Sequence, residues 1–166
     1  CAVGMALAGK RDGKDYRVFT MVGDGEINEG IVWEAMMCAN KYKLDNYIML
    51  FDNNGLQLDG TTDQIMPGLD MSKKAADFGF DVYEIDGHDM AQILDTFDKI
   101  RAAKNGKPKF INAHTVKGKG VDYMENSLDW HGKAPNKEQY QMEWVQHMNS
   151  LKAQAEELVM NELIYS

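Results

Sequence analysis

Four short apolar runs separated by segments of helical periodicity are the feature that most constrains the fold of this 166-residue chain. The runs cover residues 17–22, 47–52, 81–85 and 109–114, and helical patterns cover residues 29–42, 72–78 and 90–104. Each run is rich in β-branched or aromatic residues and is bounded by Gly, Asp, Asn or Pro, as strands are. This alternation predicts an α/β fold, a doubly wound, mostly parallel sheet with helices on both faces. The first two runs are almost continuously apolar, which predicts strands buried on both faces.

The ends and the loops add less regular segments. The first residues have a helical pattern, and we expect Gly9 and the basic residues after it to end that helix. Because this reads as a helix already under way, we expect the chain to lack residues before Cys1. We interpret residues 1–166 as one incomplete domain whose tail, residues 136–166, is helical. The loops 54–69 and 117–133 are long for a compact domain, and such loops are usually functional.

Charge and cysteine content exclude several classes of function. The net charge is −8 and the pI is about 4.9, which argues against nucleic-acid or anionic-membrane partners. Cys1 and Cys38 have neither zinc-site nor C-x-x-C spacing, which predicts reduced thiols and a cytoplasmic location. No apolar run approaches the roughly 18 residues of a membrane span.

Oxygen-bearing residues follow the first two predicted strands. Gly23-Asp24-Gly25 follows the first, and Asn53-Asn54 follows the second, with Asn54 thirty residues after Asp24. Neighbouring parallel strands would bring these ends together, at the edge where doubly wound sheets bind ligands. Asp24, the Asn54 amide oxygen and a backbone carbonyl near Leu56 would form the all-oxygen half-shell that Mg²⁺ prefers. The helix that begins near residues 26–29 would direct its amides at the same place, so the pattern suits a diphosphate held through a cation.

Each part of this pattern also has a simpler interpretation. A lone G-D-G after a strand is most often a turn. Asn54-Gly55 could be the turn of a hairpin. The hairpin is disfavoured because Leu56 and Leu58 do not lead into a convincing paired strand. The joint pattern is more specific than either part.

The pairing of GDG with a downstream NN resembles the signature of thiamine diphosphate enzymes. The wider text is similar to transketolase, in "VGDGEINEGIVWEAMMCANKYKLDNYIMLFDNNGLQLDG", in "DGHD" and in "HTVKGKGVDYMENSLDWHGKAPNKEQY", over about residues 1–140. The form "DWHGKAPN" is most similar to the N-terminal subunit of split transketolases, in which the diphosphate-binding and pyrimidine-binding domains are separate chains. The resemblance implies transfer of a two-carbon ketol unit from a ketose phosphate to an aldose phosphate, as in the pentose phosphate pathway.

For the cofactor, the resemblance implies thiamine diphosphate held through Mg²⁺, or through another divalent cation such as Ca²⁺ or Mn²⁺. Its metal ligands would be the Asp24 and Asn54 side chains and the Leu56 carbonyl. Gly23 and Gly25 would let the backbone approach the diphosphate, where a Cβ would intrude. Leu58 matches an apolar position near the cofactor rings, with a plain core position as the alternative.

The resemblance also assigns charged and titratable residues. Glu29 and Glu34 match acidic positions at the interface with the pyrimidine domain, with a solvated helix face as the alternative. Glu26 is interpreted as a first-turn charge beside the cofactor site, favoured by the helix dipole. His131 matches the histidine beside the diphosphate and the reacting end of the substrate, where an imidazole can carry protons.

The other three histidines have weaker assignments. His88 is interpreted as a loop or cap residue, and His147 as a surface residue of the tail. His114 ends a strand where relatives often carry Lys near the cofactor, so this departure leaves its role open.

The resemblance implies a partner as well. The glutamate that activates the cofactor lies on the pyrimidine-binding domain in this family, and no such domain fits in this chain. The expected partner is the C-terminal transketolase subunit, in a heterotetramer of two plus two chains, with no turnover by this chain alone. Two alternatives stay open: an inactive cofactor-binding or scaffold module, or another thiamine diphosphate enzyme such as deoxyxylulose phosphate synthase or a 2-oxo acid decarboxylating component. The "DWHGKAPN" stretch argues against the latter.

Overall fold

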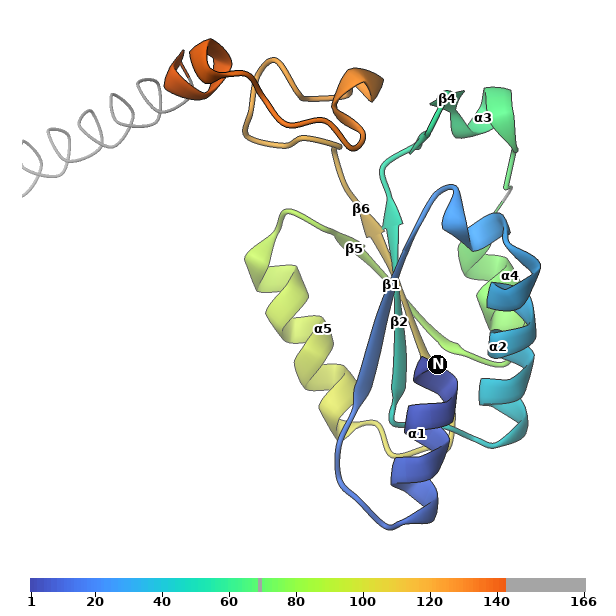
Figure 1. Ribbon diagram of the computed structural model, residues 1–166. Coiled ribbons are helices and arrows are strands. Elements are labelled where there is room, and N and C mark those ends of the chain that lie inside the picture. Colours follow the sequence, from blue (N-terminus) through green and yellow to red (C-terminus); the bar gives the residue numbers. More distant parts are fainter. Residues whose placement is uncertain (69, 143–166) are drawn as a thin grey trace, which may run out of the picture.

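The centre of the molecule is a parallel sheet with helices on both faces, which confirms the predicted architecture (Figure 1). The computed structural model describes residues 1–68 and 70–142. All pairings within the sheet are parallel, and its strand order is β1-β2-β6-β5. The strands are β1 (Val18–Gly23), β2 (Tyr47–Asn53), β5 (Asp81–Asp86) and β6 (Lys109–His114). Strand β6, the last in sequence among residues 1–68 and 70–142, therefore lies between β2 and β5.

Two core clusters lie on opposite faces of this sheet. One face is covered by α1 (Ala2–Arg11), α2 (Gly30–Lys41) and α4 (Met71–Asp77), and the other by α5 (Met90–Ala102) (Figure 1). The first core cluster includes Met36, Phe51 and Phe110. The second joins isoleucines of the sheet to Ile100 of α5. Shorter elements complete the described chain: η1 (Glu26–Asn28), α3 (Thr62–Ile65), β3 (Leu56–Gln57), β4 (Gly60–Thr61) and η2 (Leu128–Trp130).

Strand β1 departs from the prediction of burial on both faces. It is an edge strand, and its side chains Phe19 and Met21 are 51% and 67% exposed. The prediction holds for β2, which is central and largely buried. The apolar run in β1 thus reflects one covered face and one exposed face beside α5.

The first helix ends at the basic residues Lys10 and Arg11, as predicted, but Gly9 lies inside it. Helix α1 continues through it to Arg11 and ends at Asp12, followed by Gly13 with a φ of +64°. A Cβ at Gly9 would collide with the ring of Tyr16, whose hydroxyl donates to the Met5 carbonyl at 2.9 Å. Close packing of Tyr16, and not helix termination, explains this glycine.

The loop after β2 contains a short hairpin that the sequence did not favour. Strands β3 and β4 pair antiparallel, with Leu56 opposite Thr61. Their turn lies at Leu58 and Asp59, not at Asn54-Gly55. The Asn-Gly pair instead shapes the bend that leaves β2, where Gly55 has a φ of +74°.

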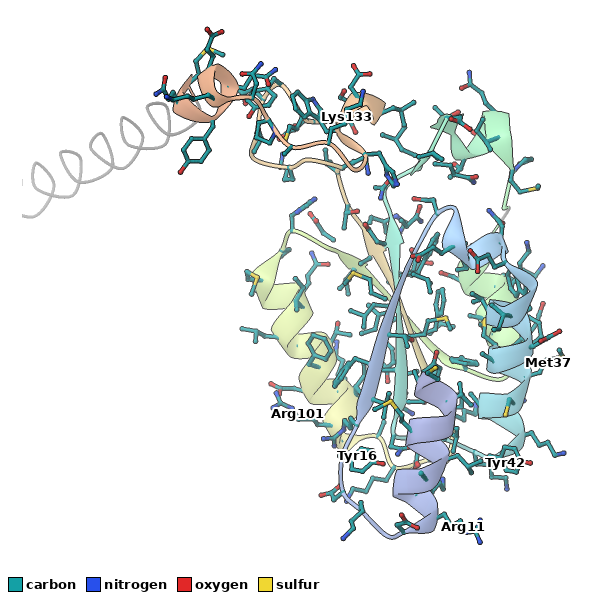
Figure 2. The ribbon with its side chains drawn as sticks, viewed as in Figure 1. Arg11, Tyr16, Met37, Tyr42, Arg101 and Lys133 are labelled. Atoms are coloured by element: carbon teal, nitrogen blue, oxygen red, sulfur yellow. The ribbon has the colours of Figure 1, made fainter. Side chains whose placement is uncertain are left out.

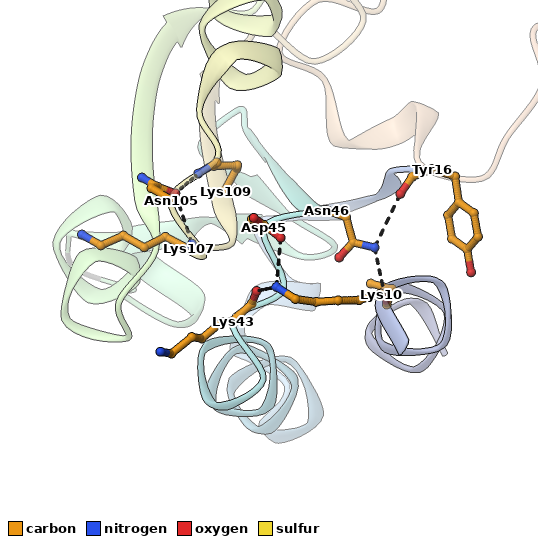
Figure 3. Close-up of polar contacts among 9 residues, drawn as sticks. Lys10, Tyr16, Lys43, Asp45, Asn46, Asn105, Lys107 and Lys109 are labelled. Atoms are coloured by element: carbon orange, nitrogen blue, oxygen red, sulfur yellow. Dashed lines mark hydrogen bonds and ion pairs between the residues drawn. The ribbon is translucent and has the colours of Figure 1, made fainter. Parts of the chain in front are cut away.

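Buried and half-buried charges join the loops at the amino ends of the strands (Figure 3). Lys109 Nζ has a fully buried side chain and donates to Asn105 Oδ1 and to Asp81 Oδ2, both at 2.7 Å. Lys10 Nζ bonds to Asp45 Oδ1 at 3.0 Å and to the Lys43 carbonyl. These contacts fix the end of the sheet opposite to the candidate site.

The predicted tail lies mostly outside the described residues, as does His147. Residues 137–142 are helical. Asn136 and Gln139 exchange two hydrogen bonds of 2.9 Å at the start of this segment, where the sequence predicted the helix to begin. Within the described residues, every helix is too short or too polar to cross a bilayer.

Candidate functional site

The ends of β1 and β2 bring Asp24 against the Asn54-Gly55 bend. The parallel register pairs Gly23 with Asp52, so the residues that follow each strand are neighbours. The backbone N–H groups of Asn54 and Gly55 donate to Asp24 Oδ2 at 2.8 and 3.0 Å. With Oδ2 held in this way, the remaining lone pairs on Oδ1 are available to a cation.

Asp24 is a buried carboxylate with only 5% of its surface exposed. Burial raises the pKa of the Asp24 carboxyl, and the nearby charge of Asp52 adds to the rise. Hydrogen bonds from the backbone amides of the bend act in the opposite direction. A bound divalent cation would offset the burial and favour the ionised form.

Asn54 is oriented by two contacts. Its Nδ2 donates to Asp52 Oδ2 at 3.2 Å, and its Oδ1 accepts from the Leu56 N–H at 3.0 Å. The Thr115 hydroxyl also donates to Asp52. Asp52 and Thr115 thus support a candidate ligand without belonging to the expected ligand set. Asp52 could have been predicted from the sequence, because it is a polar residue at the end of an apolar strand. Thr115 could not, because it reaches Asp52 only through the pairing of β2 with β6.

The donor set suits a hard cation. Asp24, Asn54 and Leu56, the three expected ligands, are joined by direct hydrogen bonds around one bend. Among the described residues there is no cluster of three or more His, Cys, Asp or Glu side chains with metal-binding geometry. A cation here would therefore have neutral oxygens beside one carboxylate, as Mg²⁺ accepts when phosphate and water complete its shell.

Neither the backbone conformation nor the packing of the described residues explains why position 25 is a glycine. Its backbone is right-handed, with φ −78° and ψ −48°, and a Cβ there would have no neighbour within 4 Å. A ligand lying against this backbone would supply the missing reason. Glu26 Oε2 accepts from the Gly23 N–H at 3.0 Å, so this side chain caps the turn that carries Asp24.

The other expected site residues lie around this centre without touching it. His131 is exposed in the segment 117–133, beyond the carboxyl ends of the strands, where Figure 2 labels Lys133. Its Nδ1 lies 3.3 Å from Lys117 Nζ. Leu58 is 62% exposed in the turn between β3 and β4, so it is not a core residue. Within residues 1–68 and 70–142, no hydrogen bond joins His131 to Asp24 or Asn54.

The acidic residues expected at an interface are both exposed. Glu29 directly precedes α2, and Glu34 lies within the helix. Ile31 and Met37 on the same helix are 68% and 52% exposed. An apolar and acidic strip of α2 therefore faces away from the sheet.

His88 and His114 both join strand ends. His88 Nε2 accepts from the Val116 N–H at 2.8 Å, which ties the loop after β5 to the segment after β6. His114 Nε2 lies 2.8 Å from Glu84 Oε2. Glu84 is a further polar residue of the site that the sequence alone did not single out.

A family model described as the thiamine diphosphate binding domain of transketolase matches residues 5–158. The chain belongs to the transketolase family. This confirms the resemblance seen in the GDG and NN segments and implies thiamine diphosphate as the cofactor of the family domain.

Curated subunits of split transketolases are similar over most of the chain. An apulose-4-phosphate transketolase subunit of Phocaeicola vulgatus is 45% identical over 139 residues, which are 84% of this chain and 49% of that protein. A 6-deoxy-6-sulfo-D-fructose transketolase subunit of Clostridium sp. is 41% identical over 130 residues, or 78% and 47% of the two chains. The chain spans about half the length of these relatives.

Solved transketolases share the fold. The transketolase of Campylobacter jejuni matches with a TM-score of 0.72 and 31% identity, over 77% of this chain and 21% of that one. The transketolase of Leishmania mexicana matches with a TM-score of 0.67, over 92% and 27% of the chains. At 23% identity, the second match supports the fold alone.

Proposed function

We propose that this chain is the diphosphate-binding subunit of a split transketolase that binds Mg²⁺–thiamine diphosphate and transfers a two-carbon ketol unit together with a pyrimidine-domain partner. The observation that carries the proposal is the buried Asp24 carboxylate, held by the Asn54 and Gly55 amides. Burying a carboxylate beside Asp52 is unfavourable unless a cation neutralises it. A cation with attached diphosphate meets that need.

The residues of this chain then have distinct tasks. Asp24, Asn54 and the Leu56 carbonyl hold the cation, and the backbone at Gly23 and Gly25 lies against the diphosphate. Asp52 orients Asn54 through its 3.2 Å hydrogen bond. Thiamine diphosphate, when bound, supplies the carbanion stabilisation that breaking and forming the ketose C–C bond requires.

Proton transfer at the reacting end of the substrate falls to His131. Lys117 Nζ lies 3.3 Å from its Nδ1 and can donate to it, which leaves Nε2 of a neutral imidazole to carry the mobile proton. The segment 117–133 reaches over the carboxyl ends of the strands, so closure of this segment on a ligand would bring His131 to the site (Figure 1).

The outer strip of α2 is the proposed contact with the partner. Ile31 and Met37 of α2, and Tyr42 directly after it, are large residues with 44% to 68% of their surface exposed, and Glu29 and Glu34 lie near them. Figure 2 shows Met37 and Tyr42 on the side of α2 away from the sheet. Exposed apolar side chains beside charged ones are typical of interaction surfaces. Two copies of each chain would form the heterotetramer.

We expect Ile31→Asp to weaken association with the pyrimidine-domain partner by about tenfold or more, because a charge would be buried in the centre of the contact. Titration calorimetry with the purified partner measures this. Met90→Asp, at a 64% exposed position on the opposite face of the molecule, is the matched control. Equal loss in both variants would contradict this placement of the interface.

Turnover is the test of the function as a whole. We expect ketol transfer by a mixture of this chain and the pyrimidine-domain partner, and none by either alone. Apulose-4-phosphate and 6-deoxy-6-sulfo-D-fructose, which the names of the relatives mention, are the first donors to assay. A mixture that binds the cofactor without turning over any ketose would favour the binding or scaffold module instead.

A further inference from the structure

A chain of hydrogen bonds joins five polar side chains beside the candidate cation site, on the face of the sheet that α4 covers. Asn53 Nδ2 donates to Asn112 Oδ1 at 3.1 Å and lies 3.5 Å from His114 Nδ1. Asn112 Nδ2 donates to Ser72 Oγ at 3.0 Å. His114 Nε2 lies 2.8 Å from Glu84 Oε2.

The carboxylate of Glu84 determines which nitrogen of His114 carries the proton. An ionised carboxylate only accepts, so His114 must donate its Nε2–H to Glu84 Oε2. Ser72, His114 and Asn112 lower the pKa of Glu84, in keeping with an ionised group. His114 therefore presents an unprotonated Nδ1 to Asn53, and Asn112, whose Nδ2 donates to Ser72, presents its Oδ1.

Asn53 can meet these two acceptors in one orientation only. Its Nδ2 carries two protons and faces both Asn112 Oδ1 and His114 Nδ1. A protonated His114 Nδ1 would instead place two donors face to face. Asn53 Oδ1 is left facing away from these two acceptors, and no hydrogen bond reaches it from any described residue. Asn53 lines a cleft of about 460 Å³ together with Asp24.

From this geometry, and resting on the proposed function, we infer that Asn53 offers its carbonyl oxygen to a hydrogen-bond donor of the Mg²⁺–diphosphate ligand, and that Glu84 and His114 are the positioning residues that set it. The donor is a cation-bound water or an N–H or O–H group of the ligand. Asn53 also precedes Asn54 directly, and its backbone carbonyl accepts from the Thr115 N–H at 3.1 Å. Orienting Asn53 thus also fixes the start of the bend that holds the cation ligands.

Two variants of His114 separate its two contacts. His114→Asn keeps an acceptor where Nδ1 lies and loses the contact with Glu84. His114→Gln keeps a donor where Nε2 lies and removes the acceptor for Asn53. Titration calorimetry of the full chain with thiamine diphosphate in excess Mg²⁺ gives the dissociation constant. We expect His114→Gln to weaken binding about tenfold, the lower end of the range for outer-shell partners. His114→Asn and Glu84→Ala both keep an acceptor for Asn53 but lose the contact that orients it, so each should weaken binding by a similar and smaller factor.

A second measurement needs no ligand. Nitrogen-15 NMR of the imidazole reports the tautomer of His114, which we expect to be protonated at Nε2; protonation at Nδ1 would overturn the inference. Thermal unfolding of each variant separates lost binding from lost folding. If the wild type binds, Asp24→Asn abolishes binding and His114→Gln leaves it unchanged, the inference about Asn53 is overturned and the proposed function is not. Absence of binding by the wild type would overturn the proposed function and the ligand contact with it.

Discussion

Replacing Asp24 with asparagine is expected to weaken binding of Mg²⁺–thiamine diphosphate more than about 100-fold. Loss of a residue that only supports a metal ligand costs about 10–100-fold in affinity, and Asp24 is expected to be a ligand itself. Asparagine keeps an oxygen for the Asn54 and Gly55 amides, so the bend is retained while the charge that attracts the cation is lost. Titration calorimetry of the chain, with and without its partner, measures the dissociation constant. The fold is checked by circular dichroism.

The matched control for this experiment is Asp59→Asn. Asp59 is an exposed carboxylate at the tip of the hairpin in the same loop, so its loss changes the net charge equally without touching the bend. Equal binding by Asp24→Asn and the wild type would remove Asp24 from the cation site. It would favour the interpretation of the chain as a scaffold of this fold.

Removing Asp81 is expected to lower the free energy of unfolding by about 3–5 kcal/mol, the cost of leaving a buried charge without its partner. Asp81 is the acidic partner of Lys109. The Lys109 side chain is fully buried and donates to Asn105 (Figure 3). Urea unfolding of Asp81→Ala measures the loss. Adding Lys109→Met should recover part of it, because no unpaired charge then remains inside. Asp95→Ala, which removes an exposed ion pair with Lys99, should cost at most about 1 kcal/mol.

The same pair predicts a dependence on pH. Burial opposes ionisation of Asp81, but hydrogen bonds from Lys109 and Asn105 outweigh it and hold the pKa of Asp81 below its usual value. A lowered folded-state pKa gives stability that is present above the unfolded value of about 3.9 and is lost as pH falls through the folded value. The difference between the wild type and Asp81→Ala should therefore be constant near neutral pH and shrink only in acid. A difference that vanished near pH 7 would contradict the pairing.

Local patterns in the sequence were enough for the strands of the sheet and for the contact between Asp24 and the Asn54 bend. The run 109–114 is a strand with the predicted bounds, and Asp24 lies against Asn54 because strands that follow one another through a helix are commonly neighbours. Strand order was not accessible in the same way, since β6 inserts between β2 and β5. The contacts of Glu84 and Thr115 depend on that insertion, so no spacing in the sequence pointed to them.

Exposure was the other quantity that local patterns could not give. Phe19 and Leu58 are as apolar as the core residues of β2, yet each is more than half exposed. Burial depends on whether another element covers a position, and an edge strand or a hairpin tip lacks that cover. The same apolar run can therefore fill a core or face solvent.

The central position of β6 sets an order in which the molecule can assemble during synthesis. The β1–β2 pair and the Asp24 bend need only the first third of the chain, so they can form early. Strand β5 has no partner in the sheet until residues 109–114 arrive between it and β2. Pairings that span this much sequence form slowly and leave apolar surface open in the meantime. A nascent chain that has not yet reached β6 would thus carry the parts of a cation site on a two-stranded sheet with an unpaired edge at β2. We expect chaperones to recognise this form.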